Sequence, residues 1–175
     1  MQHYINTKNH IPPWILTTNI TFGLTIEWYS IFKKNDKSYI CNQFIHNANL
    51  SDEDTKEFMK KALDLLREYR NAIAHGNRTF SDHRKSIIPK KQLLALAPNY
   101  ISETEYNSGL GQKDLYSVIL LFVLLLNDQY LIANFFLDLK NILNPYNETT
   151  FSDKTIFEAF HLPNDLFKRF DQLSN

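Results

Sequence analysis

Residues 51–77, SDEDTKEFMKKALDLLREYRNAIAHGN, decide the fold, because they contain one long amphipathic helix together with the signals for both of its ends. Ser51 precedes three acidic residues, which is typical of an N-cap and a first turn that complements the helix dipole. We interpret these acids as dipole partners rather than metal ligands. The pair Gly76 and Asn77 is a typical C-terminal stop. With 3.6 residues per turn, six side chains fall on one stripe that we expect to be buried: Phe58, Ala62, Leu65, Leu66, Tyr69 and Ile73.

Start and stop signals elsewhere predict further helices, so we expect an all-α fold, a bundle of about four to five helices. Residues 77–112 contain several Pro and Gly signals and predict a long irregular loop, with one helical turn near 91–97. Four other helices are expected. The first runs from Pro12 to Lys34, and a short second one follows a cap at Asn35 or Asp36. The last two cover residues 113–143 and 153–173.

The length and composition of the chain suit one core. It has 175 residues, of which 43% are apolar and 14% aromatic, so we expect residues 1–175 to form a single domain. The one cysteine, Cys41, is expected to be a small buried residue. The N-terminus lacks the pattern of a secretory signal, and the apolar run Leu115–Leu126 is too short to cross a bilayer. We therefore expect a cytoplasmic protein that has no membrane partner.

The charges are unevenly distributed although their sum is zero. Residues 56–91 carry ten Lys and Arg against four Asp and Glu, whereas residues 92–175 carry five against ten. The basic stretch includes the end of the long helix and part of the predicted loop. A nucleic acid backbone is the natural partner of such a stretch, although a solvated loop has the same composition. The loop residues that we predict to contact RNA are Arg84, Lys85, Lys90 and Lys91.

The end of the long helix gathers the densest chemistry. The planar fork of Arg70 suits a phosphate group, and His75 can exchange protons near neutral pH, with Asn71 between them. Their five-residue step turns Arg70 and His75 about 140° apart on an ideal helix. Either the last turn unwinds, or a second copy related by two-fold symmetry completes the groove. A histidine that only complements the helix dipole is the alternative. Arg67 is expected to pair with Asp64 instead of joining the site.

These residues resemble a known family. Arg70-Asn71-Ala72-Ile73-Ala74-His75 resembles the R-N-x-x-x-H signature of HEPN domains, the helical RNases of toxin–antitoxin, CRISPR and abortive-infection systems. Pro13-Trp14-Ile15-Leu16 followed by Phe22-Gly23 is similar to the P-x-W…S-F-G segment of Abi-like phage-resistance proteins. Ala74-His75-Gly76-Asn77-Arg78 resembles their A-H-x-x-R continuation. Abi-like proteins usually carry a longer helical region before the tryptophan segment, so we expect this chain to correspond to their C-terminal half.

The resemblance implies a HEPN-like bundle and a metal-independent endoribonuclease that acts as a homodimer. The ribose 2′-hydroxyl would attack the adjacent phosphate and leave a 2′,3′-cyclic phosphate and a 5′-hydroxyl. His75 would act as general acid or base, Arg70 would stabilise the phosphorane, and Asn71 would orient Arg70 or a phosphate oxygen. Arg78 would be an auxiliary phosphate contact. No metal or cofactor is expected, because RNA supplies the nucleophile, and an antitoxin or regulatory RNA is the further expected partner.

Two other functions stay open at this point. A non-catalytic binding module would use Arg70, Arg78 and the basic loop to hold RNA or a protein partner without cleaving RNA. Its RNA binding would survive the substitution His75→Ala. A helical dimerisation domain would use the motif only for structure, so Arg70→Ala would lower stability while RNA binding and cleavage were absent throughout.

Overall fold

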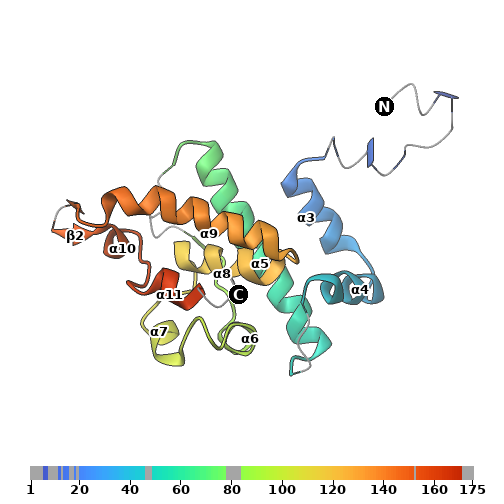
Figure 1. Cartoon of the computed structure of the whole chain (residues 1–175). Coiled ribbons are helices and arrows are strands. Elements are labelled where there is room, and N and C mark those ends of the chain that lie inside the picture. The colour runs from blue at the N-terminus through green and yellow to red at the C-terminus, as the bar shows by residue number, and fades with distance from the viewer. Residues whose placement is uncertain are drawn as a thin grey trace. The chain divides into compact units, whose positions relative to one another are not determined.

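The chain is described from a computed structural model (Figure 1). The structure describes residues 6–7, 12, 14–15, 18, 20–45, 49–77, 84–151 and 153–170. These residues form nine α-helices, α3 to α11, with one short 3₁₀ helix and one two-stranded hairpin. The predicted all-α class is confirmed, although the helices are more numerous and shorter than predicted. None of the described helices is long and apolar enough to cross a membrane.

The chain divides into two compact units, residues 1–33 and residues 34–175, and the predicted single domain stays a prediction. In the first unit, α3 spans Phe22–Ile31 and its N-cap is Thr21, whose Oγ1 accepts a hydrogen bond of 3.2 Å from the Leu24 amide. Thr21 has an extended backbone. The prediction of one continuous helix from Pro12 to Lys34 is therefore wrong, because a new helix begins at this cap.

The second unit is organised around α5, Asp52–Ala74, which packs against α4, α6 and α8. Its Ser51 cap accepts a hydrogen bond of 3.1 Å from the Asp54 amide, as predicted. The preceding helix, α4, spans Lys34–Phe44 and buries Cys41 completely, as predicted for this residue. The buried face of α5 includes four residues of the predicted stripe: Phe58, Ala62, Leu65 and Tyr69.

The acidic first turn of α5 forms ion pairs with lysines. Asp52 lies 2.7 Å from the Nζ atom of Lys56, and Glu53 pairs with both Lys34 and Lys56. Side-chain hydrogen bonds to these lysines lower the pKa values of Asp52 and Glu53. The first turn therefore ties α5 to the start of α4, in addition to complementing the helix dipole.

The predicted irregular loop over 77–112 is wrong in its second half. The expected turn near 91–97 is present as α6, Lys90–Leu96, and a further helix, α7, spans Glu103–Asn107. This helix begins with a reciprocal capping box between Ser102 and Glu105, a signal that is visible in the sequence.

The long apolar helix predicted over 113–143 is broken in two. The structure has α8 over Leu115–Leu125 and α9 over Gln129–Leu143, and α9 runs past α8 in Figure 1. The break occurs because Asp128 caps a new helix, its Oδ1 accepting hydrogen bonds from the amides of Tyr130 and Leu131. The two helices contact each other through the rings of Phe122 and Phe135, whose centres are 5.2 Å apart.

The last predicted helix, over 153–173, is also wrong as a single element. Thr155 caps a new four-residue helix, His161 has a left-handed backbone with φ of 55°, and Pro163 follows. Residues 171–173 of the prediction lie outside the described residues. The observed elements are a 3₁₀ helix at Asn144–Tyr146, a hairpin of Thr150–Phe151 and Lys154–Thr155, α10 at Ile156–Ala159 and α11 at Leu166–Phe170.

Candidate functional site

The motif residues lie at the C-terminal end of α5, which stays helical through Ala74. Two backbone hydrogen bonds end the helix. The Gly76 amide donates to the Ile73 carbonyl at 3.1 Å, and the Asn77 amide donates to the Ala72 carbonyl at 2.8 Å. Gly76 has φ of 66°, so this end is a Schellman motif that needs a left-handed residue. The last turn therefore does not unwind, and that route to joining Arg70 with His75 is absent.

The side chains of Arg70, Asn71 and His75 are all exposed. Nη1 of Arg70 donates a hydrogen bond of 3.1 Å to Oδ1 of Asn71, which is the contact expected of an asparagine that orients the guanidinium. In the part of the chain that the structure describes, no carboxylate forms an ion pair with Arg70. Its charge is therefore available to an external anion.

One copy of the chain does not bring Arg70 and His75 to the same point. Because α5 stays wound, the two residues keep about 140° of angular separation and about 7.5 Å of rise. Ile73, which we expected to be buried, lies between them and is 64% exposed, while Ala72 takes the buried position with 5% exposure. The prediction for Ile73 is wrong because every residue from Ile73 to Asn77 projects beyond the packed part of α5.

The structure does not bring two of the predicted RNA-binding lysines, Lys90 and Lys91, together with the motif. Lys91 forms an ion pair of 2.6 Å with Asp54 in the first turn of α5, and Lys90 forms one of 2.7 Å with Glu103. Asp54 and Arg70 are 16 residues apart on α5, a distance of about 24 Å along the helix axis. Lys90 and Lys91 therefore hold α6 in place at the far end of the motif helix.

Arg84 and Lys85, in contrast, return to the last turns of α5. The guanidinium carbon of Arg84 lies 4.5 Å from the centre of the Tyr69 ring. Glu68 accepts hydrogen bonds from the Lys85 amide at 2.9 Å and from the amide and hydroxyl of Ser86 at 3.2 and 2.7 Å. Within the described ranges, neither the Arg84 nor the Lys85 side chain has a carboxylate partner, so both are free to meet an anion beside the motif.

Two further sequence predictions concern the same region. Arg67 pairs with Asp64 at 3.1 Å, as predicted, and so does not join the site. Arg78, the predicted auxiliary phosphate contact, lies outside the described residues.

Sequence reasoning missed the roles of Glu68 and Tyr69. The aromatic residue was visible only as part of the buried stripe, and nothing local marks Glu68 as the partner of residues 17 and 18 positions later.

Comparison with known families adds evidence on the first half of the chain. Residues 1–81 match the family of Abi-like proteins. The Abi-like segment contains the tryptophan segment, α3 to α5 and the whole motif, and it ends six residues after His75. This match supports the resemblance seen in the sequence. Arg84 and Lys85 lie beyond it, so their relation to the site rests on the fold alone. No curated protein and no solved structure matches the chain.

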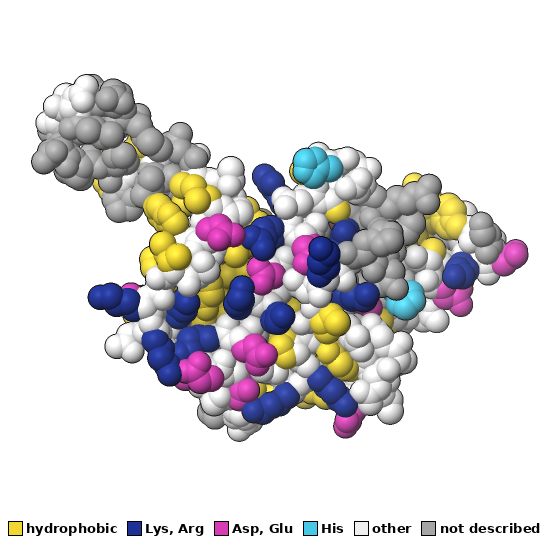
Figure 2. Space-filling view, turned by 180° about the vertical axis from the view of Figure 1, so that it is seen from behind, with side chains coloured by type: hydrophobic (Ala, Val, Ile, Leu, Met, Phe, Trp, Pro, Cys, Tyr) yellow, Lys and Arg dark blue, Asp and Glu magenta, His cyan; other side chains and the backbone are white. Residues whose placement is uncertain are grey.

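The charge on the molecular surface is mixed. Figure 2 shows Lys and Arg side chains interspersed with Asp and Glu over one face, without a continuous basic surface. Such a pattern suits a local contact with a few phosphates better than the coating of a long polyanion. Among the described residues, no group of three or more His, Cys, Asp or Glu side chains lies close enough to hold a metal ion.

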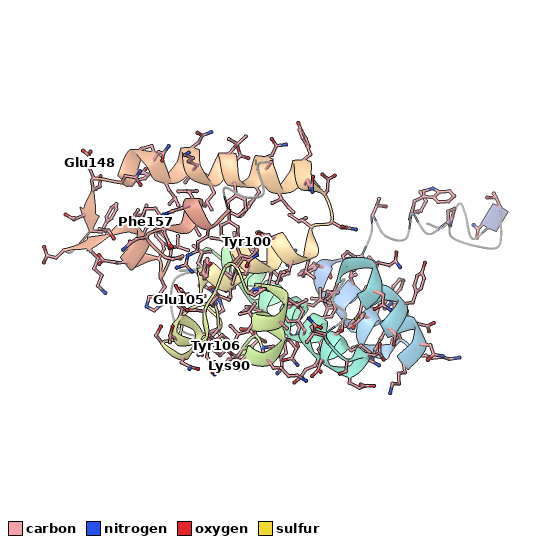
Figure 3. All side chains as sticks on the ribbon, turned by 60° about the horizontal axis from the view of Figure 1, so that its bottom comes forward. Lys90, Tyr100, Glu105, Tyr106, Glu148 and Phe157 are labelled. Carbon is pink, nitrogen blue, oxygen red and sulfur yellow. The ribbon has the colours of Figure 1, made fainter. Side chains whose placement is uncertain are left out.

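A separate cavity of about 590 Å³ lies between α7 and the segment that joins α10 to α11. Its polar wall includes Arg169, which donates hydrogen bonds to Glu105, to Asp165 and to the Tyr100 carbonyl. Figure 3 labels two of these partners, Tyr100 and Glu105. The hydrogen bond from Arg169 lowers the pKa of Glu105 to about 2, against an ordinary value of 4.5. Arg169 and Glu105 are therefore hydrogen-bonded to each other, and this contact joins α11 to α7.

Proposed function

We propose that this protein is a metal-independent endoribonuclease of an anti-phage or toxin-type defence system, with a composite site of Arg70, Asn71 and His75 from two copies. The Abi-like match supports a role in abortive infection. The observation that carries the catalytic proposal is the exposed end of α5. There, Arg70 is hydrogen-bonded to Asn71 and has no described acidic partner, five residues before an exposed histidine.

The proposed chemistry follows from these side chains. One His75 accepts the proton of the ribose 2′-hydroxyl as its oxygen attacks the adjacent phosphorus, and the His75 of the second copy donates a proton to the departing 5′-oxygen. Arg70 donates hydrogen bonds to the non-bridging oxygens, where negative charge accumulates, and Asn71 holds the guanidinium in place. The products are a 2′,3′-cyclic phosphate and a 5′-hydroxyl, and no metal enters any of these steps.

The need for two copies follows from the geometry of α5. Arg70 and His75 of one helix point apart. The two side chains of a single copy therefore cannot contact the same phosphate together. A two-fold axis near the end of α5 would bring one copy's Arg70 toward the other's His75. The same contact would cover Ile73, which is otherwise an exposed apolar side chain between two polar ones.

The direct test is cleavage of end-labelled RNA by the full chain in excess chelator. We expect cleavage by the wild type and a loss of about 10²–10⁴-fold in rate for His75→Ala, because that is the usual contribution of an acid–base group. Arg70→Ala should also lose activity. The matched control is Lys61→Ala, which removes an exposed charge from the same helix and should cleave as the wild type does. A requirement for Mg²⁺, or equal cleavage by all four proteins, would overturn the proposal.

A non-catalytic RNA-binding module is the second candidate, because Arg84 and Lys85 offer unmatched charge beside α5 independently of His75. Intact RNA bound equally well by the wild type and by His75→Ala would favour this function over the nuclease.

A further inference from the structure

Arg84 carries a charge that its surroundings leave unmatched. Its Nε and Nη2 atoms are buried, and within the described part of the chain neither donates a hydrogen bond to any acceptor. A buried charged donor without an acceptor is costly, because it has lost its hydration without replacement. Because Nε and Nη2 are covered, an acceptor from outside the protein can reach this group only at its remaining nitrogen, Nη1.

Three other cations near α5 receive a carboxylate from the fold. Lys91 pairs with Asp54, Lys90 with Glu103 and Arg67 with Asp64. Glu68 binds the segment that follows Arg84, but both of its oxygens already accept hydrogen bonds from the Lys85 and Ser86 backbone amides and from the Ser86 hydroxyl. Among the described residues, Arg84 therefore has no carboxylate partner, and its charge is available to an anion from outside the protein.

The guanidinium of Arg84 is also oriented. It stacks on the ring of Tyr69, the residue immediately before Arg70, and Glu68 fixes the two residues that follow Arg84. Stacking on an aromatic face leaves the edge of the guanidinium plane available for hydrogen bonds, and the Nη1 end of Arg84 can donate them to a phosphate oxygen. Nη1 has no described partner and is not buried as Nε and Nη2 are, so the group opens to solvent at that end.

We propose that Arg84, stacked on Tyr69, forms a preorganised subsite for an RNA phosphate group next to the motif of α5. For its substrate class, this inference rests on the proposed function. An oxyanion would approach at Nη1 and accept its hydrogen bonds, while Nε and Nη2 stay covered by the protein. The phosphate bound here would flank the one at Arg70, because Tyr69 places Arg84 against the same turn of α5.

The first arm of the test uses inorganic phosphate and needs no cleavage. Phosphate at about five times its Kd should raise the Tm of the wild type by about 2–4 °C, beyond the effect of chloride at equal ionic strength. Arg84→Met should lose this shift, because methionine keeps contact with the Tyr69 ring but has no donor. Arg84→Lys should regain only part of it, because it restores the charge without the fork. A phosphate shift as large in Arg84→Met as in the wild type would overturn the subsite.

The second arm uses a single-stranded RNA with His75→Ala as the non-cleaving background. Adding Arg84→Met should weaken RNA binding about 10–100-fold, the range for a charged hydrogen-bonding group. Lys85→Met, which removes one exposed neighbouring charge, should cost only about 2–5-fold. A neutral methylphosphonate at one linkage should then remove the effect of Arg84→Met, and an effect that persists whichever linkage is neutral would contradict an oriented phosphate contact.

The two arms also separate this inference from the proposed function. If phosphate binding depends on Arg84 but the wild type never cleaves RNA, the subsite stands and the nuclease does not. If RNA is cleaved while phosphate stabilises the wild type and Arg84→Met equally, the nuclease stands and the subsite does not.

Discussion

The C-terminal cap of α5 should control the stability of the protein and the placement of His75 together. Gly76 has φ of 66°, and a Cβ atom built on it meets no atom of the described residues within 4 Å. The substitution Gly76→Ala therefore tests the strain of the backbone. The cap also fixes the chain directly after His75 through the hydrogen bonds of Gly76 and Asn77.

The expected cost follows from the conformation. A left-handed residue other than glycine is strained by about 1–2 kcal/mol. Alanine recovers about 0.4–1 kcal/mol by restricting the unfolded chain, so Gly76→Ala should be destabilising by roughly 1 kcal/mol. For a protein of this size, that loss lowers Tm by about 2–4 °C, which thermal denaturation followed by circular dichroism resolves. RNA cleavage measured well below Tm should fall as well, because the strain is relieved by moving the residues that follow α5.

The control for this prediction is Gly76→Asn. Asparagine adopts the left-handed conformation more readily than alanine and is the usual alternative at this helix position. Gly76→Asn should therefore be more stable than Gly76→Ala although its side chain is larger. A Gly76→Ala protein as stable as the wild type, or a Gly76→Asn protein less stable than Gly76→Ala, would refute the reasoning.

Two further predictions concern the second unit. Glu105 has a pKa lowered to about 2 by its hydrogen bond to Arg169, so its contribution to stability is complete above about pH 4.5 and is lost as the pH falls toward 2. In thermal melts, the difference in Tm between the wild type and Glu105→Gln should shrink as the pH falls across that range. A difference in Tm that stays constant with pH would contradict this prediction. Gly111→Ala should be destabilising by about 2–5 kcal/mol, because strain at φ of 73° adds to a Cβ position 2.4 Å from Cδ1 of Ile101. Gly109→Ala is also at positive φ, but its Cβ would meet no described atom within 4 Å. It should show the strain alone in urea denaturation, and equal losses of stability for the two variants would rule out the clash.

The sequence predicts the motif helix well because its signals are local. The Ser51 cap, the apolar stripe and the Gly76 stop all lie within the same 27 residues and all agree. The breaks near Asp128 and Thr155 were missed although their caps were visible, because a continuing apolar pattern outweighed them. Element boundaries depend on such competition between caps and pattern.

The surroundings of the motif were harder to predict because they depend on distant pairs. Lys91 and Asp54 are 37 positions apart, and no local pattern distinguishes Lys91, which is paired, from Lys85, which has no described carboxylate partner. Ile73 fits the buried stripe by periodicity, yet it projects beyond the packed part of the unit. Charge counts along the sequence identified the basic stretch, and the fold then separated the cations that stabilise α6 from those beside the motif.

In the proposed mechanism, RNA supplies the nucleophile at a site made by Arg70 and His75. This is tested by the chemistry of the product ends, with a matched substrate that carries a single 2′-deoxy nucleotide at the cleavage position. The mechanism predicts a 2′,3′-cyclic phosphate and a 5′-hydroxyl from the all-ribose RNA in chelator, and no cut at the 2′-deoxy position. Cleavage at that position, or products with a 5′-phosphate, would contradict it.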